Sequence, residues 1–406
     1  MTGQNRPTQN RPGHVGPVHI GQIACWQGVA AGLIAAIGRD PLVLLGAGLL
    51  ATAVLAVTAV RVDGRWAYEW IGLAGRYSYR RRRWPATPDP AHGRSLDLAN
   101  GRTAGTATGA GSGAEPGILA AVSPGARIGE LDLDTSIAIG VVTHEAGLTA
   151  VLEVESTVDG SVTLPSPLAL LPMAEAGESP ITAQALIEVV PAPVDTTLGT
   201  DVEQSYRSLH PTPPPARRHG WIALQATRTA DGAGTGGQEL GTVLTSAIRR
   251  TRRRLEKAGF TTRVLDRDEL ADTLDELGAD RPDPTNGAPP SGAMAEEWAH
   301  WRTPTCAQTT LAVVNWPDPS IGSAAFERLA DAAGVPTVLA LGIRRADQGV
   351  DVQAALRLTS ATRHDVDRAV HEVRACAAAT GLRLRRLDGE QAHGVAATLP
   401  LGGFLR

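Results

Sequence analysis

The sequence of 406 residues predicts a membrane-anchored α/β (α+β) protein, and three observations lead to this fold class. Residues 20–37 and residues 42–60 form two apolar runs, each close to the roughly 20 residues that cross a hydrocarbon core. Beyond residue 116, strand-like and helix-like patterns alternate, and over residues 310–387 they follow the order βαββαβ. We therefore expect a two-helix transmembrane hairpin that carries a cytosolic domain.

The two apolar runs are separated by the tetrapeptide Gly38-Arg39-Asp40-Pro41. Gly and Pro end helices, and Arg and Asp resist the bilayer, so this tetrapeptide is typical of a tight interfacial turn. A buried hairpin in a soluble core is the alternative. Arginines are concentrated outside the turn: Arg6 and Arg11 precede the first run, and Arg61, Arg65, Arg76, Arg80, Arg81, Arg82 and Arg83 follow the second, whereas the turn has one Arg, cancelled by one Asp. Basic loops stay in the cytoplasm, so we expect both termini and the main domain on the cytoplasmic side of the inner (plasma) membrane.

Small residues recur every four positions on both apolar runs: Ala24, Gly28, Gly32 and Ala36 on the first, and Gly48, Thr52 and Ala56 on the second. Small residues on one helical face let another helix approach closely. They could serve packing of the two helices against each other, or docking on the spans of another protein. Neither run contains a charged residue, so we expect no proton or ion pathway there.

Composition narrows the classes of function. With a net charge of -4, the chain offers no case for nucleic-acid binding. The three cysteines are isolated in sequence, which predicts neither a metal site nor a disulfide framework and agrees with a reducing cytoplasm. The Gly-, Ala- and Arg-rich bias is typical of a high-GC bacterial genome.

Composition also suggests six regions. They are a disordered tail (1–17), the transmembrane hairpin (18–60), a basic juxtamembrane segment with a Gly/Ala linker (61–115), a cytosolic α/β unit (116–278), a Pro/Gly-rich loop with a connector (279–309) and a cytosolic βαββαβ unit (310–406).

In the first cytosolic unit, strands 137–142 and 148–154 flank the Gly-containing turn 144–147 and predict a β-hairpin. The other predicted strands are 127–134, 185–190, 221–226 and 261–265, and the predicted helices are 202–209, 238–258 and 268–277.

In the second unit, the predicted order is strand 310–316, helix 321–333, strands 337–343 and 350–358, helix 363–380 and strand 382–387. This is the ferredoxin-like arrangement, in which two helices cover one face of an antiparallel sheet. The helix 363–380 places five apolar residues on one face, which needs a sheet to cover it: Val366, Ala369, Val370, Val373 and Ala377.

Two patterns resemble ligand-binding motifs. The glycine-rich run 232–237, followed by Asp266 at the end of the next strand, loosely fits a dinucleotide fingerprint, although a plain flexible loop fits as well. Asp132 and Asp134 resemble the D-x-D metal site of glycosyltransferases, although acids on an edge strand give the same pattern. We assign no catalytic, cofactor-binding or metal-binding residue.

A basic cluster lies on the helix 238–258: Arg249, Arg250, Arg252, Arg253, Arg254 and Lys257. Three interpretations are open: the cluster faces solvent, contacts anionic lipid headgroups, or contacts an acidic protein neighbour. The residues we expect to contact membrane or partner are Gly28, Gly32, Ala36, Arg80, Arg81, Arg82, Arg83, Arg249, Arg250 and Arg253.

Four motifs together resemble one family. They are Leu387-Asp388-Gly389-Glu390-Gln391, the segment from Ala396 to Gly403, Ser205-Tyr206-Arg207-Ser208-Leu209, and the segment from Ala216 to Leu224. The chain resembles EccE, the two-span component of the type VII (ESX) secretion membrane complex of mycobacteria and related actinobacteria.

The resemblance implies a structural subunit that assembles with EccB, EccC and EccD and is not an enzyme. The alternative is a membrane-tethered glycosyltransferase-like or nucleotide-binding enzyme. The ending from Ala396 to Gly403 either seals the protein's own sheet or docks on EccD or EccC.

Overall fold

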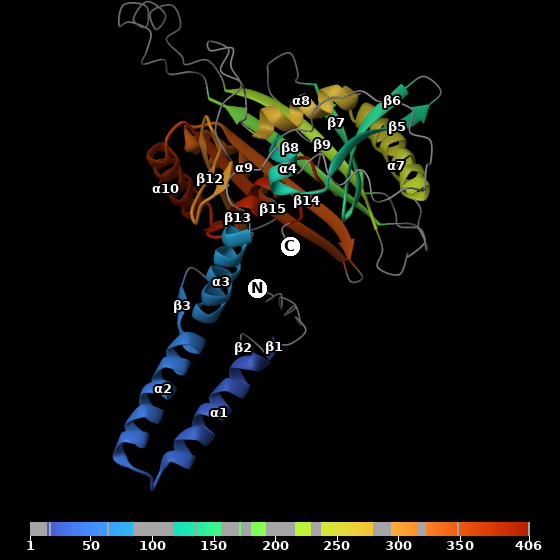
Figure 1. Cartoon of the computed structure of the whole chain (residues 1–406). Helices are drawn as coiled ribbons and strands as arrows, with labels where there is room; N and C mark the ends of the chain where they lie inside the picture. Colours follow the sequence, from blue (N-terminus) through green and yellow to red (C-terminus); the bar gives the residue numbers. More distant parts are fainter. Residues whose placement is uncertain are drawn as a thin grey trace, which may run out of the picture. The chain divides into compact units, whose positions relative to one another are not determined.

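The computed structural model describes residues 14–15, 18–62, 65–83, 117–134, 137–155, 170–171, 180–191, 216–228, 237–278, 294–315, 322–346 and 349–404 (Figure 1). The chain forms two compact units, Met1–Arg83 and Trp84–Arg406. Several predicted segments lie outside the described residues: most of the tail 1–17, the linker, the helix 202–209 and the loop 279–293.

The first unit is built on a pair of helices, α1 (Ile20–Ala36) and α2 (Pro41–Ala59). The predicted turn between them is confirmed. Gly38 has a φ of 86°. Asp40 caps α2, because its Oδ1 accepts the N–H of Leu42 at 3.1 Å, and Pro41 occupies the first turn, where its missing N–H costs nothing.

Two pairs of two-residue strands and a further helix flank this helix pair. They are β1 (His14–Val15) and β2 (Val18–His19) before it, and β3 (Arg61–Val62), β4 (Arg65–Trp66) and α3 (Ala67–Arg83) after it.

One described helix is long and apolar enough to cross a membrane, namely Pro41–Thr58 with a mean hydropathy of 2.2. The apolar part of α1 is shorter, at Cys25–Ala36. The helical hairpin is therefore observed, whereas the two-span topology stays a prediction.

The second unit is a mixed helix and antiparallel-sheet structure. Its described strands are β5 (Arg127–Asp134), β6 (Ile137–His144), β7 (Gly147–Val154), β8 (Ile181–Val190), β9 (Arg217–Thr227), β10 (Thr262–Val264), β11 (Ala295–Glu296), β12 (Trp301–Arg302), β13 (Ala307–Asn315), β14 (Thr337–Ala346), β15 (Gly349–Ser360) and β16 (Arg383–Arg386). Its described helices are α4 (Gly117–Val122), α7 (Gly237–Lys257), α8 (Arg267–Gly278), α9 (Gly322–Ala333), α10 (Arg363–Ala379) and α11 (Gln391–Ala397).

The twelve described strands of this unit form one sheet. Its order is β11-β12-β13-β15-β14-β8-β9-β7-β6-β5, with β10 beside β7 and β16 beside β13. The predicted hairpin of β6 and β7 is confirmed, with His144 opposite Gly147. The two predicted cytosolic regions meet in this sheet, because β8 pairs along β14 from Thr182 opposite Arg344 to Val189 opposite Thr337.

The elements of residues 307–386 follow the predicted order β13-α9-β14-β15-α10-β16. Their strands lie in the order β16-β13-β15-β14, with every neighbouring pair antiparallel. The elements β7, β8, β9, α7 and β10 repeat this strand order as β10-β7-β9-β8. Two related strand arrangements are thus joined edge to edge.

Both faces of the sheet are covered, because side chains alternate along each strand. On β9, Ile222 and Leu224 pack with the apolar side of α7, whereas Trp221 and Ala223 pack with α8. On β15, Leu356 and Leu358 pack with α9 and α10. One face therefore carries α7, α9 and α10, and the other carries α4, α8 and α11 (Figure 1).

Candidate functional site

The C-terminal motif Leu387-Asp388-Gly389-Glu390-Gln391 turns the chain from β16 into α11. The N–H of Leu387 donates to the C=O of Thr310 at 3.0 Å, and the N–H of Gly389 donates to the C=O of Trp298 at 2.6 Å. Gly389 has a φ of 70°, a conformation that glycine adopts without strain. The motif therefore attaches to β13 and to the segment 294–302.

Gln391 and Glu296 fix the start of α11. The buried Gln391 side chain accepts the N–H of Thr310 through Oε1 at 2.9 Å. Oε1 of Glu296 accepts the N–H of Ala392 at 3.1 Å, which satisfies an amide that the helix leaves unpaired. The motif therefore acts by hydrogen bonding to the backbone of neighbouring segments.

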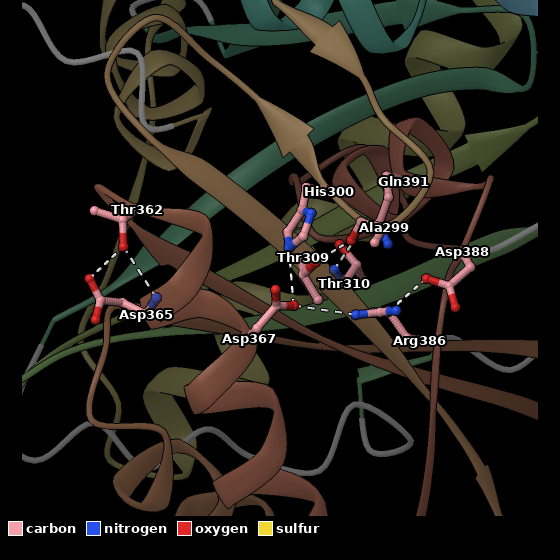
Figure 2. Close-up of polar contacts among 10 residues, drawn as sticks. All are labelled: Ala299, His300, Thr309, Thr310, Thr362, Asp365, Asp367, Arg386, Asp388 and Gln391. Carbon is pink, nitrogen blue, oxygen red and sulfur yellow. Dashed lines mark hydrogen bonds and ion pairs between the residues drawn. The ribbon is translucent and has the colours of Figure 1, made fainter.

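Four charged or titratable side chains meet beside this turn, and we call them the signature cluster: His300, Asp367, Arg386 and Asp388 (Figure 2). Oδ1 of Asp367 lies 3.2 Å from Nε2 of His300 and 3.4 Å from Nη1 of Arg386. Nε of Arg386 donates to Oδ1 of Asp388 at 2.6 Å. Figure 2 also shows Thr309 donating its hydroxyl to the C=O of Ala299. The cluster joins the segment 294–302, α10 and β16.

Thr362 caps α10 close to this cluster (Figure 2). Its Oγ1 accepts the N–H of Asp365 at 3.2 Å and donates to Oδ2 of Asp365 at 2.7 Å. The hydrogen bond from Thr362, helped by the charge of Arg368, lowers the pKa of Asp365 below its ordinary value. The ionised carboxylate therefore favours the folded start of α10.

Arg357 is fully buried on β15, on the face that carries α8. Its Nη2 donates to the C=O of Leu277 at 2.5 Å, and its Nη1 donates to Oε1 of Gln308 at 3.0 Å. Nε2 of Gln308 donates to the C=O of Gly278 at 2.7 Å. Burial lowers the pKa of Arg357 to about 10, against the opposing charges of Cys306 and Glu188. Together, the side chains of Arg357 and Gln308 cap the C-terminus of α8.

The chain after α11 lies against buried glutamines of the sheet. Nε2 of Gln184 donates to the C=O groups of Ala397 and Leu399 at 2.8 and 3.0 Å, and its Oε1 accepts the N–H of Gly402 at 3.0 Å. Leu399 is completely buried. Of the two predicted roles of this ending, sealing the protein's own sheet is therefore confirmed.

Among the residues that the structure describes, the candidates for chemistry do not meet in one site. Asp132 lies exposed on β5, and the side chain of Asp134 and the glycine run 232–236 lie outside what the structure describes. His144 lies 3.2 Å from Oγ1 of Thr149 and 2.9 Å from Nε2 of Gln225, measured from its Nε2. Within the described residues, no group of three or more His, Cys, Asp or Glu could hold a metal ion.

Only part of the small-residue face of α1 is buried in the structure. Ala36 is buried, but Gly28 and Gly32 are exposed, and a Cβ added to either would meet open space. A side-chain hydrogen bond links α1 to α2 elsewhere: Nε1 of Trp26 donates to Oγ1 of Thr58 at 2.9 Å. The predicted packing of α1 on α2 through Gly28 and Gly32 is therefore wrong in this structure, because both glycines lie exposed and away from α2.

The basic residues of α7 are partly engaged by the protein itself. Arg249 donates to the C=O of Leu133, and Arg254 donates to the C=O of Leu171 at 3.2 Å. Arg253 is exposed and Arg250 is half-buried. On α3, Arg80 is half-buried and Arg81 exposed, whereas the side chains of Arg82 and Arg83 lie outside the described part.

Sequence reasoning found the C-terminal motif but not its partners. His300, Asp367 and Arg357 carry no local pattern that predicts a site. For Arg357 the available signal was a single cation inside the apolar strand 354–358, where an unpaired charge is costly and implies a buried partner.

The comparison with known families gives one match. A family model described as "Putative type VII ESX secretion system translocon, EccE" matches residues 214–313. The match begins just before β9, runs through α7 and α8 and ends within β13, so it includes Ala216 to Leu224 but not the C-terminal motif. Among curated proteins, no match is found. The resemblance to EccE is thereby confirmed, and the chain is similar to this family over residues 214–313.

Proposed function

We propose that the chain is a structural subunit of the type VII (ESX-like) secretion inner-membrane complex, assembling with EccB-, EccC- and EccD-like components. The observation that carries the proposal is the EccE match over residues 214–313. The apolar helix Pro41–Thr58 supports it, because a translocon component needs a membrane anchor.

In this proposal both helices of the hairpin span the membrane, with both termini in the cytoplasm. α1 has 17 residues, about 26 Å at ~1.5 Å per residue, which is close to a hydrocarbon core of ~30 Å. The arginines at 61–83, against a single Arg in the turn 38–41, support the orientation.

The cytosolic domain is proposed to be a scaffold with two parts, 116–278 and 310–406, of which the second is ferredoxin-like. The strand order β16-β13-β15-β14 and the packing of α9 and α10 on one face support this assignment. The linker within 61–115 would join this domain to the hairpin, the loop and connector 279–309 would join its two parts, and the tail 1–17 would precede the hairpin.

A non-enzymatic role suits the signature cluster. Asp367 contacts both His300 and Arg386, and Asp388 accepts a hydrogen bond from Arg386. These side chains therefore bind one another and join the segments that carry them. The exposed Gly28 and Gly32 on α1, Arg81 on α3 and Arg253 on α7, and the half-buried Arg250, support a proposed role of these surfaces in membrane or partner contact.

Affinity purification tests the proposal. The full-length chain, tagged at its C-terminus and extracted in mild detergent from its own cells, should retain EccB-, EccC- and EccD-like subunits in one high-mass complex. A matched sample lacking residues 1–83 controls for capture through the cytosolic domain alone. If the full-length chain purifies without any such subunit, or turns over a nucleotide sugar with Mn²⁺, the proposal is refuted.

A further inference from the structure

Two arginines lie where α2 ends and α3 begins. Arg61 belongs to β3 and Arg65 to β4, and these two strands pair antiparallel with Arg61 opposite Trp66. The N–H of Ala67 donates to the C=O of Val60 at 3.0 Å, so the chain reverses direction within this short connection. Both guanidinium groups are thereby placed next to the end of the apolar helix.

Each of these arginines stacks on a tryptophan. Cζ of Arg61 lies 5.5 Å from the ring centroid of Trp66, and Cζ of Arg65 lies 5.9 Å from that of Trp70. Such cation–π contacts orient the guanidinium plane and reduce the conformational freedom lost when it binds a ligand. The N–H of Trp66 donates to Oε2 of Glu69 at 3.1 Å, which caps the first turn of α3.

The surrounding charge and ring chemistry select an anionic ligand at the headgroup level. Residues 61–83 contain seven arginines, named above, against Asp63 and Glu69, which gives a net charge of +5. A guanidinium fork matches the oxygens of a phosphate. Tryptophan prefers the depth of the headgroups, at the boundary between apolar chains and water.

We propose that Arg61 and Arg65, held by Trp66 and Trp70, bind the phosphate of an anionic phospholipid headgroup in the leaflet at the C-terminal end of α2. The inference rests on the proposed membrane anchoring and adds the class of lipid and the residues that recognise it. It differs from general attraction by the basic segment, because the two stacked arginines form the site.

Lipid selectivity of the full-length chain tests the site. In nanodiscs of phosphatidylcholine with a minor share of phosphatidylglycerol, spin-labelled phosphatidylglycerol should be restrained at the protein in preference to spin-labelled phosphatidylcholine. Replacing both arginines, Arg61→Gln with Arg65→Gln, should remove most of this preference, because the two guanidinium groups that bind the phosphate are lost. The matched control, Arg76→Gln with Arg81→Gln, removes the same charge from exposed positions of α3 and should retain most of the preference.

A third variant, Trp66→Leu with Trp70→Leu, keeps every charge and should lose part of the preference. The site is refuted if the Arg61/Arg65 variant keeps the wild-type preference, or if the Arg76/Arg81 control loses as much. Extraction with alkaline carbonate and co-purification of the complex are measured on the same variants. Release of the wild-type chain by carbonate would contradict the proposed anchor, whereas normal anchoring and assembly without lipid preference would contradict the lipid site alone.

Discussion

Arg357 illustrates how one residue can organise the interior of this protein. A buried guanidinium costs free energy unless its donors find acceptors, and here the acceptors are the C=O of Leu277 and the side chain of Gln308. These contacts join β15 and β13 to the end of α8. The carbonyls of Leu277 and Gly278 at the end of α8, which the helix itself leaves unpaired, are thereby satisfied inside the protein.

Replacing Arg357 by Met should destabilise the protein. The substitution removes a buried charge but leaves the C=O of Leu277 and Oε1 of Gln308 without donors, at a cost of about 2–5 kcal/mol in total. The measurement is the urea unfolding of the full-length protein in detergent. Arg344→Met, at an exposed arginine paired with Asp351, is the control and should cost at most about 1 kcal/mol. Equal effects of the two substitutions would contradict the assigned role of Arg357.

The cap of α10 predicts a pH-dependent effect. Thr362→Ala should cost about 1 kcal/mol at pH 7, because it removes the hydroxyl that accepts the N–H of Asp365. Since the folded pKa of Asp365 is lowered, its contribution is present above its ordinary value of 3.8 and is lost as the pH falls through the lowered pKa. Urea unfolding at pH 7 and at acid pH should therefore show a smaller effect of Thr362→Ala in acid. Thr261→Ala, at an exposed threonine, serves as the control, and an unchanged difference across pH would contradict the mechanism.

At the scale of elements, α11 and the residues that follow it cover part of one face of the sheet. α11 and the residues after it lie over β13, β14 and β8, with Val395, Leu399 and Leu401 packed in the same cluster as the apolar side of α8. Close approach of the backbone is possible because Gly403 has no side chain, as an added Cβ would lie 2.5 Å from Cδ of the buried Gln184.

Deleting residues 396–406 should lower the melting temperature of the full-length protein, because the apolar side of the sheet would meet water. Gly403→Val should act in the same direction through its clash with Gln184. His393→Ala, at an exposed position of α11, is the control and should leave the melting temperature nearly unchanged. Unfolding is followed by circular dichroism. A normal melting temperature after the deletion would show that the segment does not stabilise the sheet.

At the scale of the whole molecule, the distribution of charge around the helix pair predicts the topology. The turn after α1 holds one Arg and one Asp, whereas the connection after α2 leads into an arginine-rich helix. This asymmetry favours a cytoplasmic location for both termini.

Cysteine labelling in intact cells measures that topology. In a chain without its natural cysteines, a membrane-impermeant reagent should label Arg39→Cys from outside and should not label Ser95→Cys until the cells are opened. A cysteine that replaces Arg345 in the cytosolic domain provides a second protected position. Labelling of the second and third positions but not the first would reverse the topology.

The sequence by itself predicted most of the elements and the resemblance to EccE, but not the helices α3, α4 and α11 or the short strands β11 and β12. Periodicity, glycines after helices and the turn at residues 38–41 act over a few residues, so most described strands and helices agree with their predicted positions within a few residues. The EccE resemblance likewise came from short motifs, and the family match over residues 214–313, which includes the motif from Ala216 to Leu224, confirms it.

Only the tertiary structure decided which residues meet. Nothing local predicts that β8 pairs with β14, because strand pairing across more than 140 residues depends on the apolar faces of the whole sheet. The same holds for Trp26, rather than Gly28 and Gly32, at the helix pair, and for His300 beside Asp367. These contacts depend on shape and charge complementarity between distant segments, which a linear pattern of residues does not encode.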